Sequence, residues 1–321
     1  YMIFLLWLTT VVTFVVIQLP PGDYVSTLVA RLEGAGHFVD AETRQAIAKE
    51  YGLDLPVHLR YVKWVTLATK GNFGYSFDWK KPVADLIGQR LALTVSIALV
   101  STLVTYIIAI PIGIYSATHQ YSVGDYIFTT WGFIGLAIPN FMLALALLYF
   151  GLRYFGVNLS GLFSKEFIGA PWNAAKFIDL IKHLPLPVFV VATGGSAGLI
   201  RVLRGTLLDE LEKQYVITAR SKGLSNVKML FKYPVRICLN PLISNLAWLF
   251  PHLISGGTIT AIVLGLPTAG PLMLRALLTQ DTYLASSILL FLTMLTLLGT
   301  TISDILLVLV DPRIRMERGT S

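Results

Sequence analysis

The charged stretch RVLRGTLLDELEKQYVITARSKGLSNVKMLFKYPVR, residues Arg201–Arg236, separates two strongly apolar parts of the chain. It contains eight lysines and arginines against three acids. Its apolar flanks place it between two predicted membrane spans. The basic excess favours the cytoplasmic side, because loops that stay on that side are rich in Lys and Arg. A charged loop of this kind offers a soluble partner a surface to bind.

The composition of this 321-residue chain indicates a membrane protein. Hydrophobic residues make up 55% of it, charged residues 13%, and the mean hydropathy is +0.69, whereas soluble domains are about a quarter charged. A helix needs about 20 largely apolar residues to cross a bilayer. The predicted spans are Met2–Leu19, Leu91–Thr118, Tyr126–Leu152, His183–Val202, Pro241–Gly265 and Tyr283–Val310. Because helices satisfy their own backbone groups in lipid, we predict an all-α polytopic membrane protein with six transmembrane helices, a single transmembrane domain over residues 1–321.

The distribution of charge predicts the orientation. With six spans, both termini lie on one side, and the Arg201–Arg236 loop and the Asp311–Ser321 tail share that side and carry the basic excess. We therefore expect both termini in the cytoplasm. The net charge of +7 is explained by these loops, so no nucleic-acid partner is expected. The apolar run from Met2 lacks a basic leader and a small-residue cleavage site, which predicts a trimmed transmembrane helix rather than a signal peptide.

Residues 20–90 are predicted to form an external helical cap between the first two spans. Asp40 is suited to cap a helix through AETRQAIAKEY, and Gly52 to close it. A second helix is expected to begin at Pro56 and to end at Gly71. Two interpretations are open: a collar packed on the outer ends of the spans, or a docking platform for an external partner.

Residues 206–240 are predicted to form a cytoplasmic coupling loop between the fourth and fifth spans. Within it, Glu212–Lys222 has the pattern of a helix, Gly223 suits a left-handed C-terminal cap, and Ser225 is placed to cap a following helix, NVKMLFKY, before Pro234. Two short helices around a glycine give a projecting knuckle that can lie in a groove of another protein. The alternative is an interfacial helix lying on anionic lipid headgroups.

The sequence lacks the patterns of common catalytic and cofactor sites. It has no G-x-x-x-x-G-K-[ST] run to cradle ATP phosphates. Its single cysteine, Cys238, excludes an internal disulfide, and its five histidines lack metal-ligand spacing. We therefore expect no enzyme activity, no catalytic residue, no cofactor and no metal in this chain. His252 is predicted to be a hydrogen-bonded interior histidine, and Asp304 to have an interhelical structural role near the cytoplasmic end of the last span.

The segment YVITARSKGLS, residues 215–225, followed by Asn240-Pro241, has the form of a known cytoplasmic signature, an Ala-containing helix with a fixed glycine and a later proline. Other motifs agree with it in order along the chain: Pro21-Gly22-Asp23, Tyr51-Gly52-Leu53-Asp54, Gly71-Asn72-Phe73-Gly74-Tyr75-Ser76-Phe77, Ile138-Pro139-Asn140-Phe141 and Asp311-Pro312-Arg313-Ile314-Arg315. Together they make the chain resemble, nearly end to end, the membrane-spanning permease subunit of the dipeptide/oligopeptide/nickel family of ATP-binding-cassette (ABC) importers.

The resemblance implies the partners. They are a second homologous permease subunit, two ATP-binding subunits that hold ATP and Mg, an extracytoplasmic solute-binding protein, and the lipid of a prokaryotic inner membrane. It also implies that the knuckle docks into a cleft of an ATPase subunit. The residues expected to couple to the ATPase are Tyr215, Val216, Ile217, Ala219, Arg220, Lys222, Gly223, Leu224 and Ser225. The expected solute is an oligopeptide or dipeptide, with short oligosaccharides or nickel as alternatives.

A translocation path is predicted from polar groups and helix breaks in two spans. Pro139 and Asn140 break the third span, and Asn245, Ser255 and Thr258 place polar groups along the fifth. Such features suit a polar path, but ordinary hydrogen bonds between helices explain them equally well. An ion-coupled secondary transporter is the alternative from another class; it would show internal repeats and several ionisable residues at mid-membrane, and this sequence shows neither.

Overall fold

The computed structural model describes residues 2–20, 22–248, 251 and 257–310. Within these residues the chain is helical apart from one two-stranded pairing, which confirms the all-α class. Contacts divide the chain into two compact units. Unit 1 comprises residues 1–94 and 267–295, and unit 2 comprises residues 95–266 and 296–321. Two long helices, α5 (Val83–Thr118) and α16 (Thr282–Val310), each contribute to both units.

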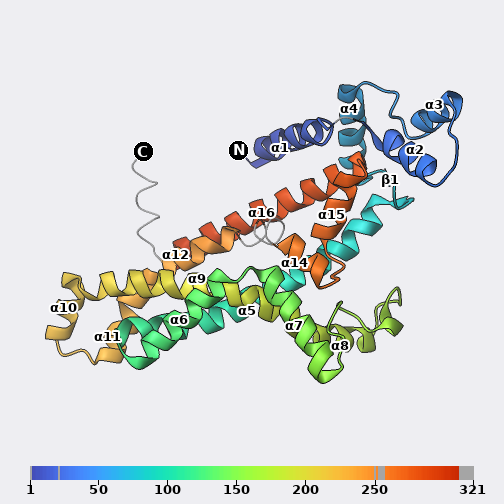
Figure 1. Cartoon of the computed structure of the whole chain (residues 1–321). Helices are drawn as coiled ribbons and strands as arrows, with labels where there is room; N and C mark the ends of the chain where they lie inside the picture. Colours follow the sequence, from blue (N-terminus) through green and yellow to red (C-terminus); the bar gives the residue numbers. More distant parts are fainter. Residues whose placement is uncertain (1, 21, 249–250, 252–256, 311–321) are drawn as a thin grey trace. The chain divides into compact units, whose positions relative to one another are not determined.

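Unit 1 contains the predicted external cap (Figure 1). Its remaining elements are α1 (Met2–Ile17), α2 (Tyr24–Gly34), α3 (Ala41–Glu50), α4 (Val57–Ala68), β1 (Tyr75–Ser76), β2 (Lys81–Pro82) and α15 (Ala269–Leu278). The two strands pair antiparallel, with Tyr75 opposite Pro82. The predicted cap helices are confirmed: Asp40 accepts a hydrogen bond from the Thr43 amide at 2.9 Å, and Pro56 precedes α4.

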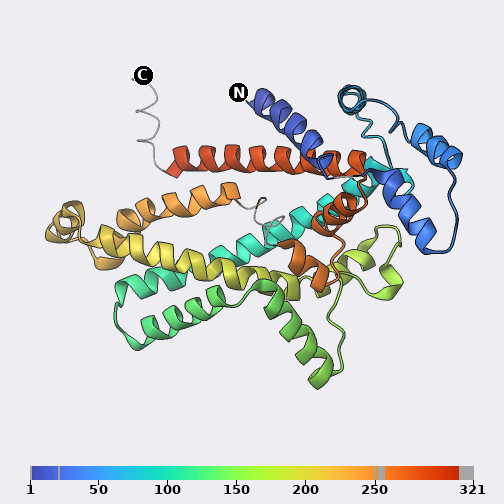
Figure 2. The same cartoon turned by 45° about the horizontal axis from the view of Figure 1, so that its top comes forward.

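Unit 2 contains the predicted cytoplasmic loop (Figure 2). Its remaining elements are α6 (Val123–Ala137), α7 (Asn140–Phe155), η1 (Lys165–Phe167), α8 (Ala174–His183), α9 (Pro185–Leu211), α10 (Gln214–Ser221), α11 (Asn226–Lys232), α12 (Pro234–Asn245), η2 (Leu246–Trp248) and α14 (Gly257–Val263). Helix α9 packs against α6, α7, α8 and α12, so it forms the centre of this unit.

Helix length supports part of the predicted six-span pattern. Helices α5, α9 and α16 are each long and apolar enough to cross a membrane, and α6 with α7 qualifies as a fourth span that is bent by 97°. The bend confirms the predicted break, since Pro139 is the residue before α7. The first predicted span corresponds to α1, which has 16 residues. Among the described residues, up to four of the six predicted spans are therefore helices long and apolar enough to cross a membrane.

Helix α12 begins at Pro234, so Pro241, the predicted start of the fifth span, lies inside that helix. Two other sequence-based expectations were wrong. The knuckle helix was predicted over Glu212–Lys222, but it starts at Gln214 because α9 continues to Leu211. Asp304 was predicted to join helices, yet its side chain is exposed. The expectation for His252 lies outside the described residues.

Close helix contacts in unit 2 depend on small residues of α9 and its neighbours. A Cβ at Gly194 would lie 2.8 Å from Asn140 Oδ1, and one at Gly113 would lie 2.8 Å from Leu203. The buried apolar cluster that results joins α5, α9 and α12. It consists of Ala109, Ala117, Leu199, Ile200, Leu203, Leu207, Val235, Cys238 and Leu242. Since Leu203 and Leu207 belong to it, burial explains why α9 continues past the predicted end of its span.

An ion pair between α6 and α9 is a second contact that stabilises unit 2. Arg204 donates two hydrogen bonds to Asp125, from Nε at 2.9 Å and from Nη2 at 2.8 Å. The Asp125 side chain is 3% exposed, so the pair is largely shielded from solvent. A bidentate contact of this kind fixes both the distance and the rotation of two helices.

A buried carboxylate organises unit 1. Asp281, at the start of α16, accepts hydrogen bonds from the Ser76 hydroxyl at 2.5 Å and from the amides of Asp78 and Leu284 at 3.2 Å. Burial raises the pKa of Asp281, and these hydrogen bonds oppose the increase. Trp64 of α4 donates to Ser287 at 3.2 Å. The cap is thus packed on the first turns of α16, as the collar interpretation requires, while docking of an external partner stays a prediction.

Candidate functional site

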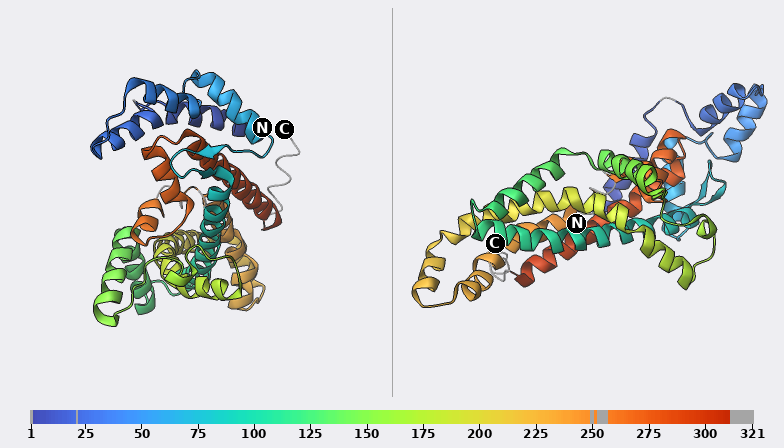
Figure 3. Two further views of the ribbon diagram at one scale, coloured as in Figure 1. Left: turned by 90° about the vertical axis from the view of Figure 1, so that its right-hand side faces the viewer. Right: turned by 60° about the horizontal axis from the view of Figure 1, so that its bottom comes forward.

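The knuckle formed by α10 and α11 lies at the ends of α9 and α12 that it connects (Figure 3, right). Gly223 turns the chain between its two helices with φ +78°, a left-handed conformation that glycine adopts without the clash a Cβ would bring. The Gly223 amide donates to Arg220 O at 3.0 Å, and the Leu224 amide donates to Ala219 O at 3.4 Å. This is the cap predicted from the sequence.

A small core of its own holds the knuckle together. Val216 and Ala219 from α10 and Met229 from α11 are buried against one another. The partly buried residues Tyr215, Leu224 and Tyr233 pack around them. The Tyr215 hydroxyl also donates to the Glu210 carboxylate in α9. Of the nine residues expected to couple to an ATPase, four therefore stabilise the knuckle itself.

The other five expected coupling residues are exposed. Ile217, Arg220, Lys222, Gly223 and Ser225 lie on the solvent side of the knuckle. Ser225 occupies the predicted cap position before α11, but its side chain makes no capping hydrogen bond.

Two large apolar residues of α11 add to this surface, since Val227 is 68% and Phe231 57% exposed. Exposed apolar side chains beside exposed cations are the chemistry of a docking surface, in which the apolar groups give affinity and the cations give orientation.

A cavity of about 460 Å³, with several polar side chains in a largely apolar lining, lies in unit 2 among α5, α7, α9 and the end of α12. Two predicted pathway residues, Asn140 and Asn245, line it together. Pro139 precedes α7 and is not part of the lining; Thr258 lies in α14 and is not part of it either. Ser255 lies outside the described residues. The structure thus brings two of the five predicted residues to one place.

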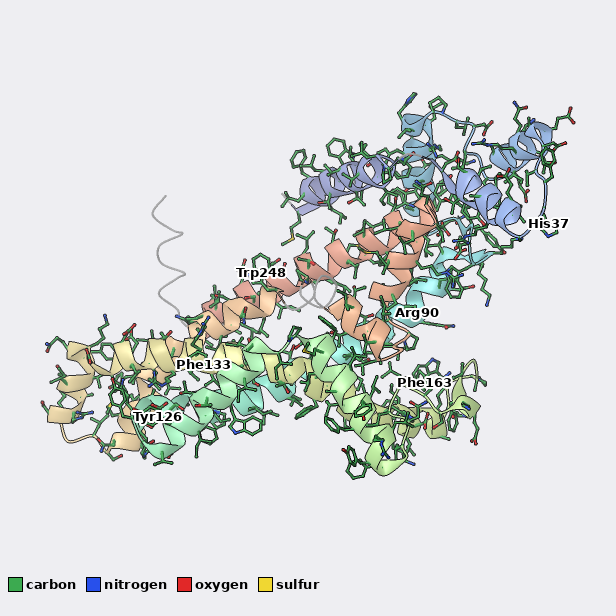
Figure 4. All side chains as sticks on the ribbon, in the orientation of Figure 1. His37, Arg90, Tyr126, Phe133, Phe163 and Trp248 are labelled. Carbon is green, nitrogen blue, oxygen red and sulfur yellow. The ribbon has the colours of Figure 1, made fainter. Side chains whose placement is uncertain are left out.

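Helix α5 contributes hydroxyl groups to the cavity that sequence reasoning missed. Ser101, Thr102 and Thr105 line it, and so does Tyr106, whose hydroxyl donates to Leu242 O at 2.5 Å. Trp248, labelled in Figure 4, lines it from η2. The missed signal was the spacing of Ser101 and Thr105, because positions i and i+4 lie on one face of a helix. Among the described residues no group of His, Cys, Asp and Glu could hold a metal ion.

The central and C-terminal parts of the chain match a known protein family. Residues 109–316 match the family model described as "binding-protein-dependent transport system inner membrane component". The chain belongs to this family. It is therefore a transport component of an inner membrane that crosses the bilayer several times, and the resemblance stated from its motifs is confirmed.

Relatives from the family are similar in sequence to this chain over most of their length. The oligopeptide transport system permease protein AppB of Bacillus subtilis is 35% identical over 306 residues, covering 95% of this chain and 93% of the relative. The inner membrane ABC transporter permease protein YejB of Escherichia coli is 31% identical, covering 97% and 95%. The oligopeptide permease OppB of Mycobacterium tuberculosis is 31% identical, covering 85% of each.

A solved structure supports the fold. A chain of the MetNI methionine ABC transporter in an inward-facing conformation superposes with a TM-score of 0.52 and 16% sequence identity. The match covers 70% of this chain and 96% of the other. This family member therefore has the helical fold of an ABC importer permease.

Proposed function

We propose that this chain is one of two homologous permease subunits of an ABC importer that carries oligopeptides or dipeptides across a prokaryotic inner membrane. An extracytoplasmic binding protein delivers the peptide to the outer side. Membership of the family supports the transport role, and the similarity to the oligopeptide permeases AppB and OppB supports a peptide as the solute. Short oligosaccharides and nickel are the competing solutes.

The observation that carries this proposal is the knuckle. It has a core of its own, a glycine hinge with φ +78°, and an outer surface that combines Ile217, Val227 and Phe231 with exposed cations. A rigid knob with exposed apolar anchors fits a groove on a soluble partner. That partner is an ATPase subunit, which holds ATP and Mg, because the sequence of this chain has no phosphate-binding loop.

Transport follows an alternating-access cycle. Closure of two ATPase subunits moves the knuckles of the two permeases, and the helices that continue from each knuckle, α9 and α12, move with it. The cavity that Asn140 and Asn245 line between α9 and α12 is then a section of the translocation path. In this arrangement both termini and residues 206–240 lie in the cytoplasm, and residues 20–90 lie outside.

Reconstitution in proteoliposomes tests the proposal. The complete importer, with ATP inside and peptide-loaded binding protein outside, is expected to accumulate a labelled oligopeptide and to hydrolyse ATP faster than without the binding protein. Uptake driven by a proton gradient without ATP would contradict the proposal and favour a secondary transporter. Uptake of maltotriose or nickel in place of peptide would overturn the peptide assignment alone.

A further inference from the structure

Helix α9 presents one face to the cavity of unit 2. Gly194, Gly198 and Arg201 all line the cavity, at positions i, i+4 and i+7, the spacing that places residues on one side of a helix. No described atom lies within 4 Å of a Cβ built on Gly198. The cavity is therefore open above Gly198, and Arg201 is the charged group at the end of this open face.

Arg201 differs from its neighbour Arg204 in having no partner. Arg204 is paired with Asp125 through two hydrogen bonds, whereas no ion pair or hydrogen bond joins Arg201 to another residue in the part of the chain that the structure describes. Arginine stays charged in proteins and presents five donors. Arg201 is exposed and lies at the end of the predicted fourth span, so its charge is available to a ligand that enters the cavity.

The remaining polar groups of the cavity complement this charge. The Ser101 hydroxyl is buried and has no hydrogen-bond partner among the described residues, although it lines the cavity. Asn140 and Asn245 add amide groups that can both donate and accept. A buried hydroxyl without a partner costs free energy until a ligand supplies one. A peptide offers partners to all of these groups. Its backbone amides can bond to the Ser101 hydroxyl and to the side-chain amides of Asn140 and Asn245, and its terminal carboxylate can bond to the Arg201 guanidinium.

We propose that Arg201 binds the C-terminal carboxylate of the peptide in transit, while Ser101, Asn140 and Asn245 bind its backbone. This inference rests on the proposed import of peptides and adds the group that the permease itself recognises. A guanidinium binds a carboxylate through two parallel hydrogen bonds, which a terminal amide cannot accept. The cavity volume of about 460 Å³ lies within the range of small-molecule sites.

The test compares trialanine with trialanine amide in the reconstituted importer. Both peptides are supplied bound to the binding protein, which is saturated with peptide, and its loading is checked by calorimetry. A preference of the binding protein for one peptide therefore does not affect the two uptake rates. For the wild-type chain we expect uptake of trialanine to be about tenfold faster than uptake of the amide, the effect of losing one charge-assisted contact. Arg201→Gln should abolish this preference, so that trialanine and its amide are taken up at the same rate. Arg201→Lys should retain part of the preference.

A matched variant controls for the loss of a charge. Arg153→Gln removes one exposed positive charge at the end of α7, outside the cavity, and should keep the wild-type preference for the carboxylate. Equal uptake of the two peptides by the wild-type chain, or an equal effect of Arg201→Gln on both, would overturn the proposal; the second result would indicate that Arg201 contacts a lipid phosphate. Failure of the wild-type importer to take up either peptide would instead reject peptide import itself.

A second pair of variants tests the cavity without changing charge. Gly198→Ala places a methyl group in the open space of the cavity, and Gly205→Ala places one on the same helix outside the cavity lining, also without contact within 4 Å. We expect Gly198→Ala to slow uptake of triphenylalanine more than uptake of trialanine, and Gly205→Ala to slow neither. An identical effect of the two substitutions would contradict passage of the peptide through this cavity.

Discussion

Replacing Gly223 should separate ATP hydrolysis from transport. The residue has φ +78°, and no described atom lies within 4 Å of an added Cβ, so the cost of Gly223→Ala comes from the backbone alone, about 1–2 kcal/mol. Gly223→Pro fixes φ near −65° and also removes the amide that donates to Arg220 O at 3.0 Å, which adds about 1 kcal/mol. The knuckle has only three fully buried side chains, Val216, Ala219 and Met229, to oppose these costs.

The assay measures two rates in proteoliposomes that contain the complete importer: peptide uptake and ATP hydrolysis. We expect the number of peptides moved per ATP to fall moderately in Gly223→Ala and to approach zero in Gly223→Pro, because α11 can no longer pack on α10. Membrane insertion should be normal, since neither substitution touches a predicted span. Gly205→Ala is the control, because it adds the same methyl group to the interior of α9, where alanine is favoured over glycine by about 0.5–1 kcal/mol.

Normal uptake per ATP by Gly223→Pro would contradict a coupling role of the knuckle, since movement of the ATPase could not be transmitted through a knuckle whose turn is disrupted. An equal loss of uptake in Gly205→Ala and Gly223→Pro would also contradict this role, because the defect would then reflect a general sensitivity of α9 and its loop to substitution.

Further predictions concern the contacts that hold each unit together. Asp125→Ala leaves Arg204 without its bidentate partner and should destabilise the protein by about 3 kcal/mol, seen as a lower melting temperature in detergent, whereas the double variant Asp125→Leu/Arg204→Met should recover most of the loss. Burial raises the pKa of Asp281 above the ordinary 3.8, so its contribution to stability is complete below that pH and is lost as pH rises through the raised pKa. Asp281→Asn should flatten this dependence when thermal unfolding is measured as the pH is raised from 3.8. Trp64→Ala should destabilise unit 1 by about 3–5 kcal/mol, measured by denaturant unfolding, while Val62→Ala on the exposed side of α4 should have little effect.

Local signals in the sequence predicted the knuckle well. The turn at Gly223 depends on the conformational freedom of one residue, and the break before α7 depends on Pro139, so both could be placed without knowledge of the fold. The start of α10 could not be placed, because the length of α9 depends on burial of Leu203 and Leu207 against α5 and α12.

Contacts between residues far apart in the sequence could not be predicted from local sequence patterns. Arg204 counted toward the basic excess of the loop, yet it is paired with Asp125, 79 residues earlier. Asp281 carries no local signal of its role, since Ser76, its hydroxyl partner, is 205 residues away. The cavity is a similar case: Asn140 and Asn245 were predicted separately, and only packing of the helices shows that they line one space with Arg201.

A cross-link from the knuckle to the ATPase would test the coupling role of the knuckle directly. Ile217→Cys places a thiol on its exposed surface, while the native Cys238 is fully buried and should stay unlabelled. With a benzophenone attached to that thiol, we predict a light-induced adduct with an ATPase subunit in the intact importer. In a separate experiment without the benzophenone, we predict no reaction of the thiol with an impermeant maleimide added outside cells. Labelling from outside, or adducts with lipid alone in the intact importer, would contradict the coupling role of the knuckle.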